Sequence, residues 1–177
     1  MKKKKNIFVI IGSASSNSAN EKLVDNIVLL TKDFFKLTIF KDLKTLPHFE
    51  PELASNNPPK EIIYFRNSTS KADGVLICTP EYVFSIPSGL KNGIEWCVST
   101  TIFSDKPTGL ITASASGEKG HQELQLIMKT IMAKFTDQTT LLIKGIKGKI
   151  TDHGQLTDTK TTDELMRFIE AFKVLVN

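Results

Sequence analysis

The chain has 177 residues, of which 40% are hydrophobic and 24% are charged, a balance typical of a globular protein and not of a disordered one. Its net charge of +4 equals the contribution of the lysine run from Lys2 to Lys5, so we expect no nucleic-acid partner. The two cysteines, Cys78 and Cys97, lack C-x-x-C spacing and therefore indicate neither a disulfide framework nor a metal site.

We expect residues 1–5 to form a flexible basic tail and residues 1–177 to form one domain with one substantial core. No apolar run approaches the length of about 20 residues that a membrane span requires. The apolar segment after the lysines is also too short for a signal peptide. The sequence therefore predicts a cytoplasmic protein that does not bind membranes.

Five short apolar runs predict strands, of which the first, rich in β-branched residues, is typical of a strand buried on both faces of a sheet and the third is also expected to be buried. In chain order, these predicted strands cover residues 7–11, 35–40, 74–78, 108–114 and 139–143. Apolar residues between and after the runs recur at helical spacing, which predicts five helices. The alternation indicates an α/β fold, in which helices cover both faces of a parallel sheet.

Capping signals mark the first and the last predicted helix. Ser18 and Glu21 match a capping box directly after the serine-rich segment that follows the first strand. Thr161 and Glu164 match a second capping box, after a polar, glycine-containing loop over residues 144–158.

The middle helices are predicted from a proline signal and from apolar spacing. Asn57 before Pro58 indicates the N-cap and first turn of a helix that ends near residue 70. Another helix contains residues 90–98. The residues that mark the helix after the fourth strand are Leu124, Ile127, Met128, Ile131 and Phe135.

Ligands of such sheets bind beyond the carboxyl ends of the strands, so the loops after the first, third and fourth strands are the candidate site. The first loop holds Ser13, Ser15, Ser16 and Ser18 at a helix start, where hydroxyls and backbone N–H groups can bind a phosphate. Capping alone explains Ser18 but not the other three serines. The loop contains neither G-x-G-x-x-G nor a P-loop motif, which argues against those two nucleotide-binding classes.

The second loop covers residues 78–96 and combines stiffness with flat apolar surface. Pro80 and Pro87 restrict its backbone, and Tyr82 and Phe84 supply aromatic rings. Such a loop suits a planar heterocycle. A packed turn whose tyrosine covers the core would have the same composition.

The two loops together resemble the NAD(P)H-dependent FMN reductases, flavodoxin-like flavoproteins that reduce flavins, quinones, azo dyes or chromate. The first motif of that family, Gly-Ser-x-Arg-x-x-Ser-x-Asn, is matched by Gly12, Ser13, Ser18 and Asn20. The second, Thr-Pro-Glu-Tyr-Asn-x-Ser-x-Pro-Gly-x-Leu-Lys-Asn-Ala-Ile-Asp-Trp, is matched by Thr79 to Tyr82, Ser85, Pro87, Leu90 to Asn92, Ile94 and Trp96. The resemblance implies a flavodoxin-like three-layer sandwich with a five-stranded parallel sheet in the order 2-1-3-4-5.

Three positions depart from the family pattern. Ser15 stands where the family has arginine, which removes a charge-assisted hydrogen bond to a phosphate and leaves the preference for NADPH or NADH open. Val83 replaces an asparagine. Ser88 replaces a turn glycine, whose flexibility Gly89 can supply.

The resemblance also implies FMN as the cofactor, bound by all three loops. The implied contacts are Ser13, Ser15, Ser18 and Asn20 in the first loop, Pro80, Glu81, Tyr82, Val83 and Ser85 in the second, and Ser114, Ser116 and Gly117 in the third. The third loop is expected beside the pyrimidine edge of the flavin, where backbone N–H groups stabilise the negative charge that reduction brings.

The implied activity is transfer of hydride from NADPH or NADH to bound flavin, followed by reduction of a quinone, a free flavin, an azo compound or a metal oxyanion. The cofactor carries this chemistry, so we predict no catalytic side chain and no metal. We expect His48, His121 and His153 to be surface or loop residues and Trp96 to be buried. The family further implies a homodimer or a homotetramer.

Two other functions are compatible with the same fold. A flavodoxin-type electron carrier would bind FMN without using nicotinamide, but such carriers are expected to be acidic, and this chain is not. A phosphate-binding signalling domain of the receiver type needs acidic residues at its strand ends, whereas the first strand here ends in Gly12 and Ser13.

Overall fold

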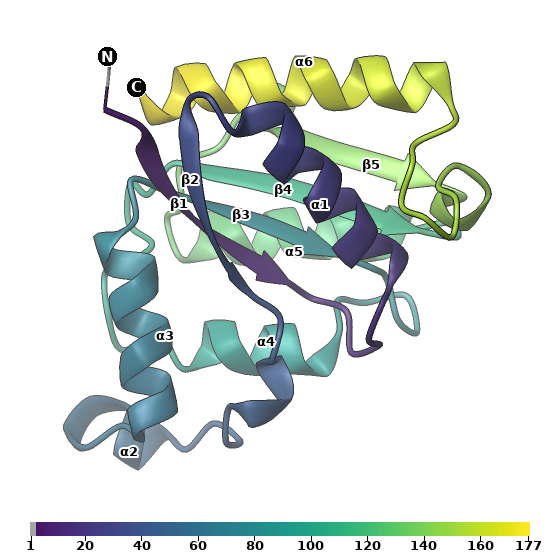
Figure 1. The fold of residues 1–177 in the computed structure, drawn as a ribbon. Helices are drawn as coiled ribbons and strands as arrows, with labels where there is room; N and C mark the ends of the chain where they lie inside the picture. The colour runs from purple at the N-terminus through teal and green to yellow at the C-terminus, as the bar shows by residue number, and fades with distance from the viewer. Residues whose placement is uncertain (1–2) are drawn as a thin grey trace.

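The computed structural model describes residues 3–177 and contains a sheet of five parallel strands in the order β2-β1-β3-β4-β5 (Figure 1). The strands are β1 (Lys5–Ile11), β2 (Phe35–Phe40), β3 (Gly74–Thr79), β4 (Thr108–Ser114) and β5 (Thr140–Lys144). The α-helices of the described residues are α1 (Ala19–Thr31), α2 (Pro51–Asn56), α3 (Lys60–Lys71), α4 (Ser88–Glu95), α5 (Glu118–Thr130) and α6 (Thr159–Val176). Short 3-10 helices are η1 (Leu43–Thr45), η2 (Asp137–Thr139) and η3 (Ile146–Gly148).

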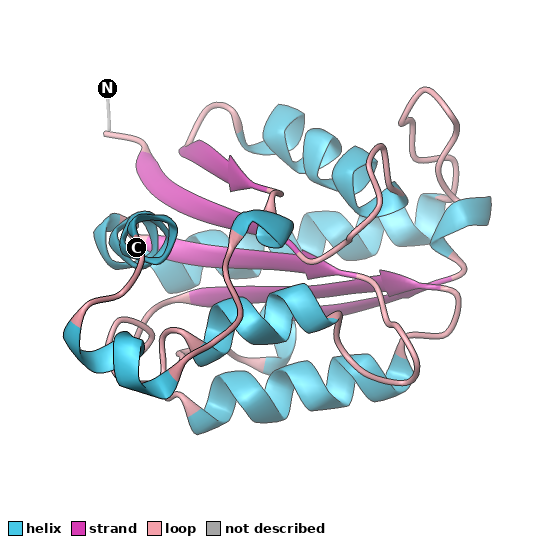
Figure 2. Ribbon diagram, turned by 90° about the horizontal axis from the view of Figure 1, so that it is seen from below, coloured by secondary structure: helices cyan, strands magenta, loops and turns pink. Residues whose placement is uncertain are grey.

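Helices cover both faces of the sheet, as Figures 1 and 2 show. The buried side chains between one face and helices α1 and α6 include Val9, Leu23, Ile27, Leu165 and Phe168. Those between the other face and helices α3, α4 and α5 include Ile10, Ile62, Leu90, Leu124 and Met128. Successive strand residues point to opposite cores, which explains why the central strand β3 is buried throughout, whereas the edge strand β2 is largely exposed. The predicted three-layer α/β sandwich and its strand order are confirmed.

The predicted strands agree with the observed ones to within two residues. β2 and β4 have the predicted bounds, β3 ends one residue later at Thr79, and β5 is displaced by one residue. β1 starts at Lys5, inside the segment expected to be a tail, and residues 1 and 2 of that tail lie outside the described residues. Lys5 belongs to the strand because its N–H group donates to the carbonyl of Phe34 at 3.1 Å.

The helix predicted to start with Asn57 as its N-cap starts two residues later, so that prediction is wrong. The N-cap of α3 is Pro59, and it provides no side-chain hydrogen bond. A residue before a proline avoids helical backbone angles, so Pro59 keeps Pro58 out of the helix. Asn57 instead ends the short helix α2, which was not predicted because its N-cap, Glu50, also lacks a capping hydrogen bond.

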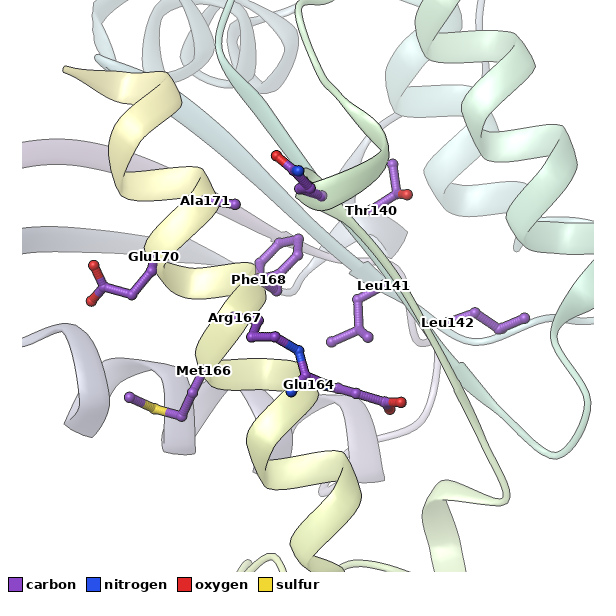
Figure 3. Close-up of a pocket in the computed structure, with 10 residues that line it drawn as sticks. Thr140, Leu141, Leu142, Glu164, Met166, Arg167, Phe168, Glu170 and Ala171 are labelled. Carbon is purple, nitrogen blue, oxygen red and sulfur yellow. The ribbon is translucent and has the colours of Figure 1, made fainter.

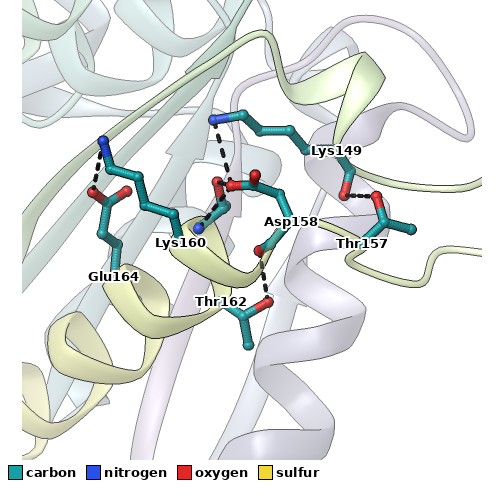
Figure 4. A network of polar contacts seen from close by, with 7 residues as sticks. Lys149, Thr157, Asp158, Lys160, Thr162 and Glu164 are labelled. Atoms are coloured by element: carbon teal, nitrogen blue, oxygen red, sulfur yellow. Dashed lines mark hydrogen bonds and ion pairs between the residues drawn. The ribbon is translucent and has the colours of Figure 1, made fainter.

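The two predicted capping boxes have different outcomes. Ser18 and Glu21 form the predicted box at α1, with both reciprocal hydrogen bonds at 3.2 Å. At α6 the N-cap is Asp158, three residues before the predicted Thr161 (Figure 4). Thr161 donates its backbone N–H at 2.8 Å and its hydroxyl at 2.5 Å to one Asp158 oxygen, which lies 3.8 Å from Lys149 Nζ. Both hydrogen bonds lower the pKa of Asp158, and the one from the Thr161 hydroxyl has the larger effect.

Among the helices of residues 3–177, none combines the length and the apolar character needed to cross a membrane. Within the same residues, no cluster of three histidine, cysteine or acidic side chains is close enough to hold a metal ion.

Candidate functional site

The loops after β1, β3 and β4 contact one another at the carboxyl edge of the sheet. The hydroxyl of Tyr82 in the second loop lies 3.4 Å from the hydroxyl of Ser13 in the first. The carboxylate of Glu81, also in the second loop, accepts the backbone N–H of Gly117 at 3.2 Å and that of Gly120 at 2.7 Å. The structure therefore brings together the three loops in which the cofactor contacts were predicted.

A pocket of about 460 Å³ opens beside the first loop, a size within the range of small-molecule sites. Its walls come from the first loop, from Tyr82, from the start of α4 and from the segment after β2. The lining residues include residues 13–16, residues 41–44, His48, Tyr82 and Ser88. The segment after β2 was not predicted as part of the site. The strand order, in which β2 is next to β1, brings it there.

Gly12 allows the ends of β1 and β3 to lie in close contact. Its N–H group donates to the carbonyl of Cys78 at 2.8 Å. A Cβ atom at this position would lie 2.2 Å from Thr79 Oγ1 and 2.6 Å from Thr79 Cβ. Only glycine fits between the strands at this point, so the first loop starts directly against the second.

The predicted phosphate contacts of the first loop differ in exposure. Ser13 is buried, whereas Ser15 and Ser16 are exposed and line the pocket. Ser18 is half-buried and caps α1. The backbone N–H of Ser15 donates to Ser13 Oγ at 3.3 Å, which keeps the loop compact.

A lysine from the segment after β2 lies at the start of α1. Lys41 Nζ is 2.9 Å from the Oε1 atom of Glu21, the acid of the capping box. Burial would raise the pKa of Glu21, but the hydrogen bond from Lys41 and the backbone bonds of the capping box outweigh burial and lower it. The pair places a positive charge beside the serine loop.

Asn20, predicted to contact the cofactor, is buried and hydrogen-bonded within the fold. Its side-chain N–H donates to the carbonyl of Ala113 at 3.1 Å, and its side-chain oxygen accepts from Cys78 Sγ at 3.3 Å. Asn20 therefore ties α1 to β3 and β4, and its contact with a cofactor stays a prediction. Cys78 and Cys97 are both buried, and burial raises the pKa of their thiols, that of Cys97 to about 12.

Tyr82 carries the hydroxyl that joins the second loop to the first. Burial would raise its pKa, but hydrogen bonds with Ser13 and Ser15 outweigh burial and lower it. Tyr82 also lines the pocket beside the first loop.

The second loop turns tightly between Tyr82 and Ser85. The N–H of Tyr82 donates to the carbonyl of Ser85 at 2.9 Å, and the reverse bond measures 3.0 Å. The two residues between them, Val83 and Phe84, have φ angles of 52° and 58°, in the left-handed region. Pro80, at the start of this loop, is buried.

The third loop is held by its contacts with the second. Gly117, the N-cap of α5, has a φ angle of 82°, and a Cβ there would lie 2.9 Å from Leu142 Cδ1. The hydroxyl of Ser114 donates to the carbonyl of Glu81 at 3.5 Å, and Ser116 is exposed. Glu81 therefore joins two of the predicted ring-binding loops.

His121 is buried, so the expectation that it is a surface or loop residue is wrong. Its Nδ1 atom lies 2.9 Å from Thr112 Oγ1, and burial lowers its pKa. It lies on the inner side of α5, three and seven residues before the buried Leu124 and Met128, a spacing from which its burial could have been predicted. His153 and His48 are both exposed, as expected, and His48 lies in the pocket wall. Trp96 is fully buried, as expected.

A second groove, of about 680 Å³, lies between β5 and α6 (Figure 3). It is lined by the first residues of β5, Thr140 to Leu142, and by α6 residues such as Arg167 and Phe168. β5 is the edge strand on the other side of the sheet from β2, whose following segment lines the first pocket, so the groove is separate from that pocket. It contains none of the predicted site residues.

The residues of the first pocket fit an ester of phosphate that carries a flat ring. The hydroxyls of Ser13, Ser15 and Ser16 line it at the N-terminus of α1, where the helix dipole favours an anion. Tyr82 adds an aromatic surface and a hydroxyl. FMN has this combination of one phosphate and one planar ring system.

The sheet order defines a flavodoxin-like α/β protein, and its candidate site lies beyond the carboxyl ends of β1, β3 and β4. The chain belongs to the NADPH-dependent FMN reductase family, whose model matches residues 5–143. The predictions of the family and of its FMN-dependent, nicotinamide-using oxidoreductase class are therefore confirmed.

Curated relatives cover nearly the whole chain. The chain is 27% identical over 177 residues to a 2-hydroxy-1,4-benzoquinone reductase of Burkholderia sp, covering 96% of this chain and 95% of the relative. It is 27% identical over 164 residues to the NADH-dependent flavin reductase subunit 2 of Lactobacillus johnsonii, covering 90% and 86%. Among solved structures, FerB, a flavoenzyme NAD(P)H:(acceptor) oxidoreductase from Paracoccus denitrificans, superimposes with a TM-score of 0.77 at 21% identity over 97% of both chains. At that identity the likeness shows the fold.

Proposed function

We propose that the protein uses NADPH or NADH to reduce a small-molecule acceptor through bound FMN, and that a quinone is the principal acceptor class. The observation that carries the proposal is the convergence of three loops. Ser13 contacts Tyr82, and Glu81 contacts Gly117 and Gly120, at the sheet edge where ligands of this fold class bind.

The first loop would hold the phosphate. Ser13, Ser15 and Ser18 provide hydroxyls, and the start of α1 provides backbone N–H groups and the positive end of its dipole. Lys41 supplies a positive charge at the same place, although Glu21 neutralises part of it. These groups would replace only in part the charge that an arginine at position 15 would carry.

The second and third loops would hold the ring, through Pro80, Tyr82, Val83 and Ser85 on one side and Ser114, Ser116 and Gly117 on the other. When bound, FMN accepts a hydride from the nicotinamide and passes two electrons to the acceptor. Glu81 fixes the backbone of the third loop through Gly117 and Gly120, so N–H groups can be oriented before the negative charge develops.

A quinone acceptor is supported by the names of the relatives. A benzoquinone reductase, quinone reductases and a flavin reductase all align over most of this chain. The overall reaction balances as NAD(P)H, one proton and a quinone giving NAD(P)⁺ and the hydroquinone. We further propose that the protein is cytoplasmic and a homodimer or homotetramer; exposed apolar residues on α3, Ile63 and Tyr64, support association.

Anaerobic titration tests the proposal. Protein loaded with FMN is expected to be yellow, and stoichiometric NADH or NADPH should bleach the visible flavin absorbance, which a quinone then restores. Bleaching by neither nicotinamide would contradict the proposed function and favour an electron carrier of the flavodoxin type.

A paired variant tests the phosphate site. Replacing Ser15 and Ser16 by alanine should raise the Kd for FMN about tenfold, since a hydrogen bond to a charged group contributes about 1.5 kcal/mol or more. Ser70→Ala, a change at an exposed serine of α3, is the matched control and should leave the Kd unchanged.

A further inference from the structure

The turn at Val83 and Phe84 has a backbone that its residues do not favour. A two-residue turn with both φ angles positive is normally built from asparagine, aspartate or glycine. Here the angles are 52° at Val83 and 58° at Phe84. A β-branched residue in the left-handed region is a rare exception, and such strain persists where the surrounding structure imposes it.

Both side chains are directed to solvent, so the core does not compensate for this backbone. Val83 is 95% exposed and Phe84 is 75% exposed, and the neighbouring Tyr82 is 37% exposed. The three residues form one apolar and aromatic tip, which we call the 82–84 tip. In the isolated chain the tip has an unfavourable free energy, because its backbone is strained and because its apolar side chains are exposed to water.

The 82–84 tip is nevertheless held firmly at its base. The carboxylate of Glu81 accepts N–H groups from Gly117 and Gly120, and the N–H of Ile86 donates to Glu123 at 3.3 Å. These bonds connect both sides of the turn to the third loop and to α5. The tip therefore presents its side chains from a fixed position on the rim of the site.

The size and charge of the tip select among possible occupants. A stable protein partner buries about 800 Å² on each side, far more than two side chains offer. A flat ring, in contrast, needs an apolar surface only of its own size, and Phe84 can stack with it. The pocket wall beside the first loop carries Lys41 and Lys44, whereas the tip is uncharged, so an uncharged ring fits the tip better than an anion.

We infer that Phe84, supported by Val83, is a specificity-determining residue that packs against a flat, uncharged acceptor of the quinone class. This inference rests on the proposed function, which brings such an acceptor to the rim of the flavin site. It explains why the turn keeps two residues that its geometry disfavours. Contact with a bound acceptor would bury the apolar surface that these two residues expose in the isolated chain.

The test is the binding of menadione, an uncharged naphthoquinone, to the oxidised FMN-loaded protein without nicotinamide. Phe84→Asn removes the ring but suits a left-handed backbone, so its thermal unfolding temperature should stay equal or rise. We expect the Kd for menadione to rise at least tenfold in Phe84→Asn and to change less than twofold in Phe84→Tyr. Leu29→Gln, which alters a leucine of α1 that is 68% exposed at the opposite edge of the sheet, should have no effect.

Turnover with two acceptors gives a second measurement. Phe84→Asn should raise the KM for menadione and leave the rate with ferricyanide, a hydrophilic anion, within twofold. An unchanged Kd for menadione would overturn the inference. So would a parallel rise in the Kd for FMN or a change in oligomeric mass, because Phe84 would then contact the flavin or a second copy of the chain.

The two proposals can fail separately. Wild-type protein that binds menadione but is not bleached by NADH or NADPH would refute the proposed function, while loss of menadione binding in Phe84→Asn would still support the role of the tip. Wild-type turnover together with full menadione binding in the variant would refute only the role of Phe84.

Discussion

The absence of a side chain at Gly12 determines how closely the first loop approaches the second. A methyl group there would lie 2.2 Å from Thr79 Oγ1, on a strand buried on both faces that cannot move aside. Overpacking of this kind costs about 1–3 kcal/mol. Gly12→Ala should therefore lower the free energy of unfolding by about that amount and also weaken FMN binding, as measured by urea denaturation and flavin titration.

Gly148→Ala is the matched control for Gly12→Ala. A Cβ atom at Gly148 would have no neighbouring heavy atom within 4 Å. The free energy of unfolding of the Gly148→Ala variant should equal that of the wild type. A stable Gly12→Ala variant with wild-type affinity for FMN would show that the strands separate more easily than the contact with Thr79 indicates.

Among the helices, α1 and α6 both start at a side-chain cap, but only α1 starts at the site. Ser18→Ala should cost about 1 kcal/mol of stability, the usual effect of losing a cap, and should also weaken FMN binding. Asp158→Ala should lower the unfolding temperature without changing the Kd for FMN, because its cap holds Thr161 in α6. Equal losses of FMN affinity in the two variants would contradict a phosphate contact at Ser18.

The sequence predicted the strands better than the helix starts because strands and caps depend on different interactions. The apolar run of residues 108–114 is buried except for its last residue, so its ends coincide with the ends of the strand. The start of α6 is different, because both Asp158 and Thr161 are good capping residues. The structure selects Asp158, whose oxygen binds Thr161 and lies near Lys149 of a neighbouring loop, a contact that local sequence does not reveal.

The same distinction applies to the site. The first two loops were predicted from the family motifs within them, and the third from its position after the fourth strand and from the family resemblance; their contacts with one another agree with that prediction. The lysines of the segment after β2, Lys41 and Lys44, were not predicted to line the pocket. No motif marks them. They reach the first loop only because β2 pairs with β1, which depends on the arrangement of the whole sheet.

For the molecule as a whole, the titrating groups predict that the free energy of unfolding falls in two stages as the pH decreases. Burial lowers the pKa of His121, so the unfolded chain takes up a proton more readily, and stability is lost as the pH falls below the ordinary histidine value of about 6.5. The slope from one such group is at most about 1.4 kcal/mol per pH unit. Glu21 and Asp158 also have lowered pKa values, so their contribution is present above the ordinary carboxyl range and is lost below about pH 4.5.

Urea denaturation between pH 8 and pH 4 separates the two stages. His121→Gln should remove the decline between pH 6.5 and 5 and keep the decline below pH 4.5, because glutamine does not titrate and the carboxylates are unchanged. His153→Gln, a change at an exposed histidine, is the control and should keep both stages. A decline of the same slope in His121→Gln would mean that the loss near pH 6 comes from the molecule's other titrating groups and not from burial of this imidazole against Thr112.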